Sequence, residues 1–168
     1  MSFDFQPVLK GELLELRPLR PADFQDLYRV ASDPLIWEQH PASNRYQEEV
    51  FKTYFREALE SGGALIAIDC KDGKVIGASR FHGYDPEKSE IEIGWSFLAR
   101  SHWGGSYNGE MKQLMLQHAF RFVDSVILYV SPSNLRSQRA VDKIGGVRVA
   151  SRSDPEGLDR FVYRVLKS

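Results

Sequence analysis

The chain has 168 residues, which is enough for one domain with a full hydrophobic core, and we expect residues 1–168 to form a single domain. Hydrophobic residues make up 42% of the chain and charged residues 27%, proportions typical of a soluble globular protein. The formal net charge of −1 gives no basic field to attract nucleic acid or anionic lipid. No apolar run reaches the ~20 residues that a membrane helix needs. We therefore expect neither nucleic acid nor a membrane as a partner.

The only cysteine is Cys70, so an intrachain disulfide and a cysteine metal cluster are both excluded. It follows an apolar run, and free cysteines of this kind usually fill space in a core or at a strand end. The N-terminal segment MSFDFQPVLK lacks the basic region and long apolar core of a secretory signal. These features predict a cytoplasmic protein without a bound metal.

Hydrophobic periodicity and turn residues predict the elements of the first half. A strand comes first, followed by two helices on either side of a proline-containing loop, and then by three strands in a meander. Gly62-Gly63 ends the second helix, and Asp72-Gly73 is a hairpin signal. In chain order these elements are a strand at 12–19, helices at 21–32 and 46–60, and strands at 64–70, 75–84 and 90–98.

The last strand of the meander, EIEIGWSFL, alternates in character. Ile91, Ile93 and Trp95 are predicted on one face, with Glu90, Glu92 and Gly94 on the other.

The second half predicts a helix at 106–123, a buried strand at 125–130, a helix at 133–146 and closing strands at 147–151 and 160–166. Ser133 or Asn134 would cap the second of these helices, and Gly145-Gly146 would end it. This order of elements predicts an α/β protein that has a mixed sheet with helices on both faces.

The segment SHWGGSYNGE lies directly between a strand and a helix and is rich in glycine. Backbone N–H groups at a helix start have no partner within the helix, and the helix dipole adds partial positive charge there. Small residues let an anion approach those groups, so Gly104–Gly109 could bind phosphate. A plain glycine-rich turn explains the composition equally well. The segment matches neither GxGxxG nor GxxxxGK[ST].

Three blocks of sequence, taken in order, resemble the GNAT superfamily of acyl-CoA-dependent N-acetyltransferases, and within it the RimJ/RimL-type branch. The first is LELRPLRPADFQDLYRVASDP, the second is IEIGWSFLARSHWGGSYNGEMKQLMLQHAF, and the third is VSPSNLRSQRAVDKIGG, which is similar to the pattern N-x-x-S-x-x-x-x-x-x-x-G-F. The resemblance covers nearly all of residues 10–167. It implies a central mixed, mostly antiparallel sheet of about seven strands, with a splayed cleft between the fourth and fifth strands, EIGWSFL and SVILYV.

The chain departs from the family pattern at a few positions. Ser106 and Asn108 stand where the phosphate loop usually has small residues, although both residue types favour helix N-termini. Gly146 stands where the family has a phenylalanine after the last helix.

The resemblance also implies acetyl-CoA as co-substrate and a set of residues that bind it. Backbone N–H groups of the strand would hold the thioester carbonyl and pantetheine arm, and those of the loop would hold the pyrophosphate. Asn134 would hydrogen-bond the pantetheine arm, cap the helix, or do both. Arg136 and Arg139 would either meet the 3′-phosphate or lie on a solvated helix face. The expected cofactor-binding residues are Phe97, Leu98, Ala99, Trp103, Gly104, Gly105, Ser106, Tyr107, Asn108, Gly109, Asn134, Ser137 and Arg139.

Three residues are candidates for the chemistry. Glu92 would face the amine as general base, and repulsion from Glu90 on the same face could raise its pKa; a solvated strand face is the alternative. Glu156, in the loop DPEG, is either a rival base acting through water or a turn residue. Ser137, one helical turn after Asn134, would protonate the departing thiolate or is an ordinary polar helix residue.

Further residues could border the substrates. His82 and Tyr84 could line the amine site, and His102 could face the phosphates of the coenzyme. The histidines have no metal-ligand spacing. The aromatic residues that would either wall a pocket or pack in the core are Tyr28, Trp37, Tyr54, Phe81 and Trp95.

These features predict an acetyl-CoA-dependent N-acetyltransferase that moves an acetyl group directly to a primary amine, on a small molecule or a protein N-terminus. The alternative is a catalytically silent GNAT-fold protein that binds acyl-CoA or a partner. A third interpretation, an unrelated α/β nucleotide-binding module, lacks the usual phosphate motifs. The resemblance also admits a homodimer, because many such relatives dimerise.

Overall fold

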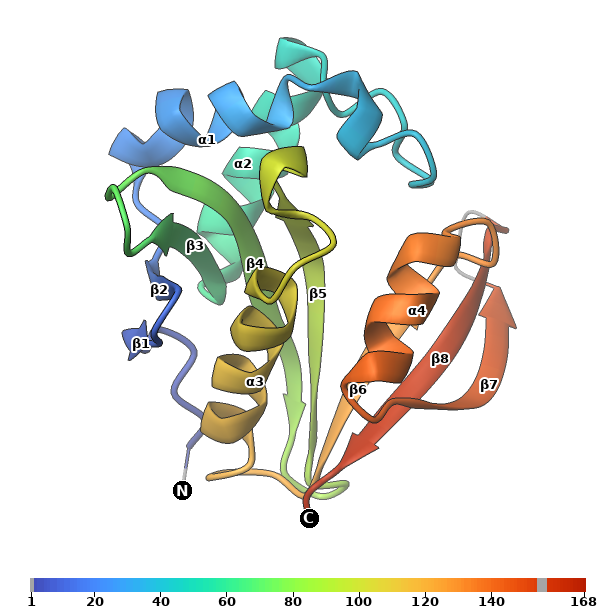
Figure 1. Cartoon of the computed structure of the whole chain (residues 1–168). Coiled ribbons are helices and arrows are strands. Elements are labelled where there is room, and N and C mark those ends of the chain that lie inside the picture. The colour runs from blue at the N-terminus through green and yellow to red at the C-terminus, as the bar shows by residue number, and fades with distance from the viewer. Residues whose placement is uncertain (1, 154–156) are drawn as a thin grey trace.

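The architecture comes from a computed structural model that describes residues 2–153 and 157–168. It is an α/β fold built on one mixed sheet of eight strands (Figure 1). The expected number was about seven, and the additional strand is the short β1 at the N-terminal edge. The strands are β1 (Leu9–Lys10), β2 (Leu14–Pro18), β3 (Ala64–Asp69), β4 (Val75–Asp85), β5 (Glu90–Leu98), β6 (Ser125–Val130), β7 (Val147–Ser153) and β8 (Asp159–Leu166).

The helices are close to those expected from the sequence, with shorter ends. The α-helices are α1 (Phe24–Ala31), α2 (Glu48–Ser61), α3 (Tyr107–Ala119) and α4 (Leu135–Lys143). Three short 3₁₀ helices are η1 (Pro21–Asp23), η2 (Pro34–Ile36) and η3 (Arg100–His102). Within the described part of the chain, no helix combines the length and apolar character needed to cross a membrane.

The sheet opens in its middle, between β5 and β6. The strand order is β1-β2-β3-β4-β5-β6-β8-β7, and β5–β6 is the parallel pair in an otherwise antiparallel sheet. Its pairing covers only Glu90↔Ser125, Ile91↔Val126 and Glu92↔Ile127. Beyond Glu92 the two strands diverge, and Figure 1 shows the gap widening away from the C-terminus. This divergence is the predicted splay.

The core consists of two clusters, one on each face of the sheet. Met111 and Met115 of α3 belong to the first cluster, together with Ile91 and Ile93 of β5. The aromatic residues of α2 build the second cluster, which includes Phe97 of β5. Strand β5 therefore contributes to one face at its start and to the other at its end.

A β-bulge in β5 explains this change of face. Ala78 pairs with Phe97 and Arg80 pairs with Gly94, so β5 carries one more residue than β4 over this interval. Trp95 lies in the bulge with a φ of 54°, a left-handed conformation that is rare for a bulky residue. Its ring packs against the second cluster. The prediction that Trp95 shares a face with Ile91 and Ile93 was therefore wrong, because an extra residue reverses the alternation.

Cys70 directly follows β3 and is exposed. It lies at a strand end, as expected, but it does not fill space in the core.

Candidate active site

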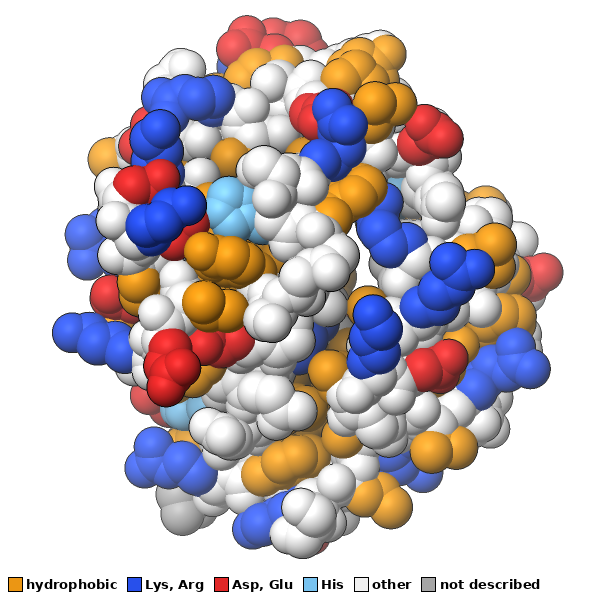
Figure 2. All heavy atoms as spheres, in the orientation of Figure 1, with side chains coloured by type: hydrophobic (Ala, Val, Ile, Leu, Met, Phe, Trp, Pro, Cys, Tyr) orange, Lys and Arg blue, Asp and Glu red, His pale blue; other side chains and the backbone are white. Residues whose placement is uncertain are grey.

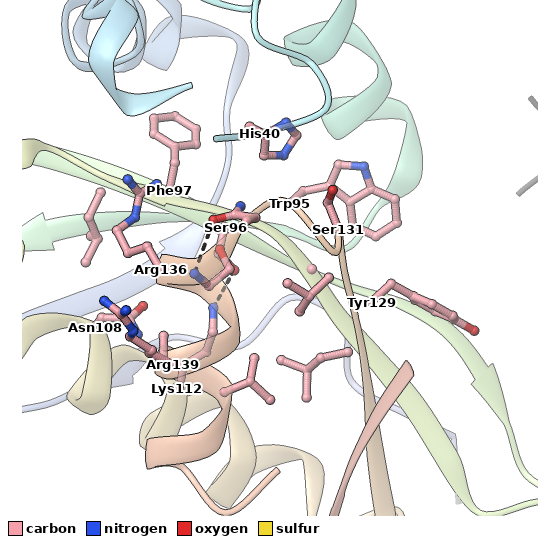
Figure 3. Close-up of a pocket in the computed structure, with 18 of the residues that line it drawn as sticks. His40, Trp95, Ser96, Phe97, Asn108, Lys112, Tyr129, Ser131, Arg136 and Arg139 are labelled. Carbon is pink, nitrogen blue, oxygen red and sulfur yellow. Dashed lines mark hydrogen bonds between the residues drawn. The ribbon is translucent and has the colours of Figure 1, made fainter. Parts of the chain in front are cut away.

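A cavity of about 580 Å³ lies where β5 and β6 separate. Its walls come from the segment after η2, the bulged end of β5, the loop before α3, the end of β6 and the start of α4. Figure 3 shows side chains of these elements converging on it, and in Figure 2 lysine and arginine side chains border the hollow between the two halves of the molecule.

The glycine-rich loop provides one end of the cavity. Gly104 has a φ of 73°, a conformation that favours glycine. The first hydrogen bond at the start of α3 runs from the Glu110 N–H to the Ser106 carbonyl, at 2.9 Å. The N–H groups of residues 107–109 therefore have no intrahelical partner. A Cβ added to Gly105 or Gly109 would meet no atom within 4 Å, so the glycines leave open space beside these donors.

The side chains of the loop have separate tasks. Trp103 lines the cavity, and its indole N–H donates to the Leu98 carbonyl at 2.9 Å. Ser106 and Tyr107 do not line the cavity, and the Tyr107 hydroxyl donates to Asp69 at 3.2 Å. Any part that Ser106 and Tyr107 play in anion binding therefore falls to their backbone N–H groups.

His102 does not face the cavity. Its Nε2 lies 2.9 Å from Asp69 Oδ2, and its Nδ1 lies 2.8 Å from the Ser101 hydroxyl. Both ring nitrogens are thus occupied, and the expectation that His102 faces the phosphates was wrong.

The end of β5 offers fewer backbone donors than expected. The Ala99 N–H donates to the Ile76 carbonyl at 2.8 Å, so it is not available to a ligand. Successive N–H groups in a strand point in opposite directions, which directs the N–H of Phe97 toward β4 as well. The predicted roles of these two N–H groups were therefore wrong. The Leu98 N–H faces the open side of the strand, as does the Leu98 carbonyl that Trp103 contacts.

The start of α4 forms a third wall. Asn134 is 5% exposed, and its Oδ1 accepts the Ser137 N–H at 3.2 Å, which confirms the predicted cap. Both residues line the cavity. In the described part of the chain, the Ser137 hydroxyl has no hydrogen-bond partner and is free to contact a ligand.

The two arginines of α4 differ in their contacts. The Arg136 guanidinium lies 3.6 Å from the centre of the Trp103 ring and donates to the Ile36 carbonyl at 3.2 Å. It therefore joins α4 to the loop and to η2. Arg139 is exposed and lines the cavity, which leaves it able to meet a phosphate.

Glu92 is half-buried on β5, at the last pair before the strands diverge. Burial raises its pKa to about 7, and the positive charges of Arg160 and Arg80 oppose that shift. Repulsion from Glu90 does not contribute, so the predicted cause of the shift was wrong. Glu92 does not itself line the cavity, whereas Gly94 and Trp95 do. A carboxylate with a pKa near 7 can accept a proton at neutral pH.

The rival base, Glu156, lies outside the described residues.

Sequence reasoning missed Lys112. It lies on α3, is 6% exposed and lines the cavity. Its Nζ donates to the Ser96 hydroxyl, which lies 2.7 Å from the Ser79 hydroxyl (Figure 3). No carboxylate forms an ion pair with it in the described part of the chain, and burial lowers its pKa to about 8. The available signal was its spacing from Leu116 and Ala119, which puts a lysine on the buried stripe of the helix.

Most of the aromatic candidates belong to the core. Trp37 and Phe81 are each 1% exposed, and Tyr54 is also buried. Trp95 is half-buried and lines the cavity, whereas His82 is exposed and meets the Trp95 ring edge-on at 5.4 Å.

Two other candidates, and His40, have different surroundings. Tyr84 packs beside the first core cluster, and Tyr28 beside the second. His40 lines the cavity, and burial first, followed by nearby arginines, lowers its pKa to about 3, so it is neutral at physiological pH. In residues 2–153 and 157–168, no group of three or more His, Cys, Asp or Glu side chains could hold a metal ion.

The splayed mixed sheet, the open loop before α3 and the capped start of α4 together define an open α/β fold with a ligand cavity where its sheet divides. A sequence model of the acetyltransferase (GNAT) domain matches residues 14–147. The chain therefore belongs to the GNAT acetyltransferase family, whose members use acetyl-CoA as co-substrate.

Solved structures agree with this assignment. An acetyltransferase from Agrobacterium tumefaciens is 28% identical, with a TM-score of 0.75 over 99% of this chain and 98% of that one. A GNAT-family acetyltransferase from Bacillus anthracis is 22% identical, with a TM-score of 0.79 over 95% of this chain and 98% of that one. The ribosomal-protein-S5-alanine acetyltransferase from Vibrio fischeri is 12% identical, with a TM-score of 0.72 over 96% of this chain and 97% of that one. The last two likenesses show the fold alone.

Proposed function

We propose that the chain is a single-domain, cytoplasmic N-acetyltransferase of the RimJ/RimL-type branch that moves an acetyl group from acetyl-CoA directly to a primary amine. One observation carries this proposal. The cavity in the splay reaches from the loop before α3 to Trp95 and Arg45 on the other face of the sheet. A direct transfer needs a site of this kind, because two substrates must meet in one space.

Each step of the chemistry has a candidate residue. Glu92, whose carboxylate lies beside the cavity-lining Gly94, accepts a proton from the attacking ammonium or amine. The Leu98 N–H donates to the thioester carbonyl as negative charge develops there. As the C–N bond forms and the C–S bond breaks, the Ser137 hydroxyl gives its proton to the departing thiolate and regains one from solvent. Glu92 then releases to solvent the proton that it took from the nitrogen. The N–H groups at the start of α3, with Arg139, hold the phosphates.

The acceptor is to be sought among both protein N-termini and small-molecule amines. The three sequence blocks support the RimJ/RimL-type branch. One structural relative is named as an acetyltransferase of a ribosomal protein. Peptides with free N-termini therefore belong in the screen beside polyamines, amino acids and aminoglycosides.

The proposal is tested by incubating the purified chain with acetyl-CoA and the amine panel, and by following both thiol release and acetylated product by mass spectrometry. We expect at least one acetylated amine. Glu92→Gln and Ser137→Ala should each lower kcat by about 10²-fold or more, the usual contribution of a general acid or base. Glu87→Gln, an exposed carboxylate in the turn before β5, is the matched control and should leave the rate unchanged.

A different result supports the silent acyl-CoA-binding alternative. In that case acetyl-CoA would bind, no amine would be acetylated, and neither variant would differ from the parent chain.

A further inference from the structure

Aromatic rings and guanidinium groups alternate beside the cavity, on the face of the sheet that α2 covers. The order is Trp37, Arg45, Tyr54, Arg80 and Trp95, and we refer to these residues as the arginine stack. Arg45 Cζ lies 5.2 Å from the centre of the Trp37 ring and 4.7 Å from that of Tyr54. Arg80 Cζ lies 5.7 Å from the Tyr54 ring centre and 4.3 Å from that of Trp95.

The stack is held firmly in place. The Tyr54 hydroxyl donates to the Trp95 carbonyl at 3.0 Å, which joins α2 to the bulge of β5. The Trp37 indole N–H donates to the Ala31 carbonyl at 2.8 Å. Trp95 is kept in its left-handed conformation, and such a conformation persists only where the surrounding structure fixes it. The fold thus fixes the positions of two guanidinium groups in advance.

Neither arginine of the stack has a directly paired counter-ion among the described residues. Arg80 is 5% exposed, and its Nε is buried without a hydrogen-bond partner in the described residues. Across the same residues, neither Arg45 nor Arg80 forms an ion pair with a carboxylate. Burial lowers the pKa of both groups, as expected for cations removed from water without a partner.

The carboxylates nearby do not neutralise this charge. Glu57 acts on both arginines but is exposed on α2. Glu92 acts on Arg80, and its own pKa of about 7 leaves it only partly ionised at neutral pH. Arg160 also lines the cavity, and its charge contributes to the lowered pKa of Arg45. Among the described residues, Arg45 and Arg80 therefore carry charge that no direct ion pair neutralises.

The form of the contacts leaves donors for a ligand. The N–H donors of a guanidinium lie in its plane and point outward from its edges. Arg45 lines the cavity, so its edge can reach a ligand, and Arg80 lies one ring deeper. A planar carboxylate matches the fork of an arginine edge.

We propose that the acceptor is an amino carboxylate, a small molecule with a carboxylate close to its amine, and that Arg45 binds this carboxylate with added attraction from Arg80. The proposal rests on the proposed function, because it names the acceptor class of that same site. Binding of the carboxylate would offset the charge of Arg45, which no described carboxylate pairs directly.

The test compares amines that differ only in the anionic group. One set is phenylalanine, phenylalaninamide and phenethylamine, and a second is leucine, leucinamide and isoamylamine. Acetyl transfer is measured at saturating acetyl-CoA, and acetyl-CoA binding is measured separately by calorimetry. We expect the amino acid of each set to be acetylated with a kcat/KM at least about tenfold above that of the matching amide and plain amine. A tenfold difference corresponds to about 1.4 kcal/mol, the contribution of one charge-assisted contact. The phosphonate analogue of phenylalanine distinguishes a carboxylate site from a general anion site.

Variants locate the effect. Arg45→Gln should remove the preference through a higher KM for the carboxylate, with acetyl-CoA binding unchanged, and Arg45→Lys should restore part of it. Arg56→Gln, an exposed arginine of α2, is the matched control and should keep the full preference. Thermal unfolding confirms that each variant is folded.

Two outcomes are distinct failures. If the amides and plain amines are acetylated as well as the carboxylates, or if the phosphonate is strongly preferred, the amino-carboxylate inference is overturned while the proposed function stands. If acetyl-CoA binds and no amine of any class is acetylated, the proposed function fails as well.

Discussion

The chemistry proposed here depends most on Glu92, whose environment gives it a pKa of about 7, mainly through burial. A general base acts in its deprotonated form, so its contribution increases as pH rises through the pKa. We predict that kcat/KM for acetyl transfer rises across a pKa near 7, and that Glu92→Gln removes this limb while retaining the limb due to the amine itself. Rates between pH 5.5 and 8.5 provide the measurement. An identical limb in the variant would show that another group is the base.

Lys112 predicts a pH dependence of stability. Burial lowers its folded-state pKa to about 8 from 10.5. Below about pH 8 Lys112 is protonated in both the folded and the unfolded state. The free energy of unfolding is then lowered by the full cost of burying the charged amine. Between about 8 and 10.5 the unfolded chain binds more protons, so the free energy of unfolding rises with pH, by about 3 kcal/mol in total.

Lys112→Met should remove this rise. Urea unfolding gives the free energy of unfolding of both proteins at pH 7, 8, 9 and 10. The difference between the two proteins at each pH isolates Lys112, because the titration of other groups cancels. Parallel curves for the two proteins would contradict the assignment of a buried charged amine.

Residue types alone predicted some features of the site and missed others. Asn134 could be predicted as a cap because asparagine before a helix is a local signal. The contacts of His102 and Ala99 depend on Asp69 and Ile76, which are distant in sequence, so a local pattern could not exclude these two candidates. The pKa shift of Glu92 could be anticipated in direction, whereas its cause, burial, emerged only from the fold.

Among the elements, α3 carries a feature that packing does not explain. Gly109 lies in its first turn, where glycine is destabilising, and an added Cβ would meet only open space. We predict that Gly109→Ala raises the free energy of unfolding by about 0.5–1 kcal/mol and weakens binding of coenzyme A, because the methyl group occupies the space beside the free N–H groups. Urea unfolding and calorimetric titration measure the two effects.

Gln113→Ala, at an exposed position of the same helix, is the control and should leave the affinity for coenzyme A unchanged. An unchanged affinity in Gly109→Ala would mean that the start of α3 does not contact the coenzyme.

Alternation and turn residues predicted the strands well, although β7 is mostly exposed and β3 and β6 are buried on both faces. The boundaries of the helices were less predictable. The helix expected to extend to residue 123 ends at Ala119, and the chain continues in tighter turns, in which Arg121 N–H donates to the His118 carbonyl and Phe122 N–H to the Ala119 carbonyl. The bulge at Trp95 could not be predicted, since an inserted residue has no local signature in a strand that otherwise alternates.

One departure from the family pattern has a packing explanation. A Cβ on Gly146 would lie 2.4 Å from Val141 Cγ1. The family's phenylalanine would therefore not fit here unless Val141 moved.

At the scale of the whole molecule, the sheet is two halves that share three residue pairs between β5 and β6. The order of the elements in the sequence suggests a sheet of two halves. The volume of the cavity depends on how far β5 and β6 diverge, which the sequence does not reveal. A ligand that contacts α3, β5 and α4 together would link the halves. It should therefore stabilise the native state as a unit.

The central claim, that coenzyme A binds in this splay, is tested most directly by thermal unfolding with acetyl-CoA, desulfo-CoA, ATP and NAD titrated separately. A ligand that binds only the native state raises its stability by RT ln(1 + [L]/Kd), ~2.7 kcal/mol at a hundredfold excess over Kd. We predict this rise with acetyl-CoA and desulfo-CoA and a much smaller effect with ATP and NAD. The absence of a rise with either coenzyme A compound would contradict the claim and, with it, the proposed transferase activity.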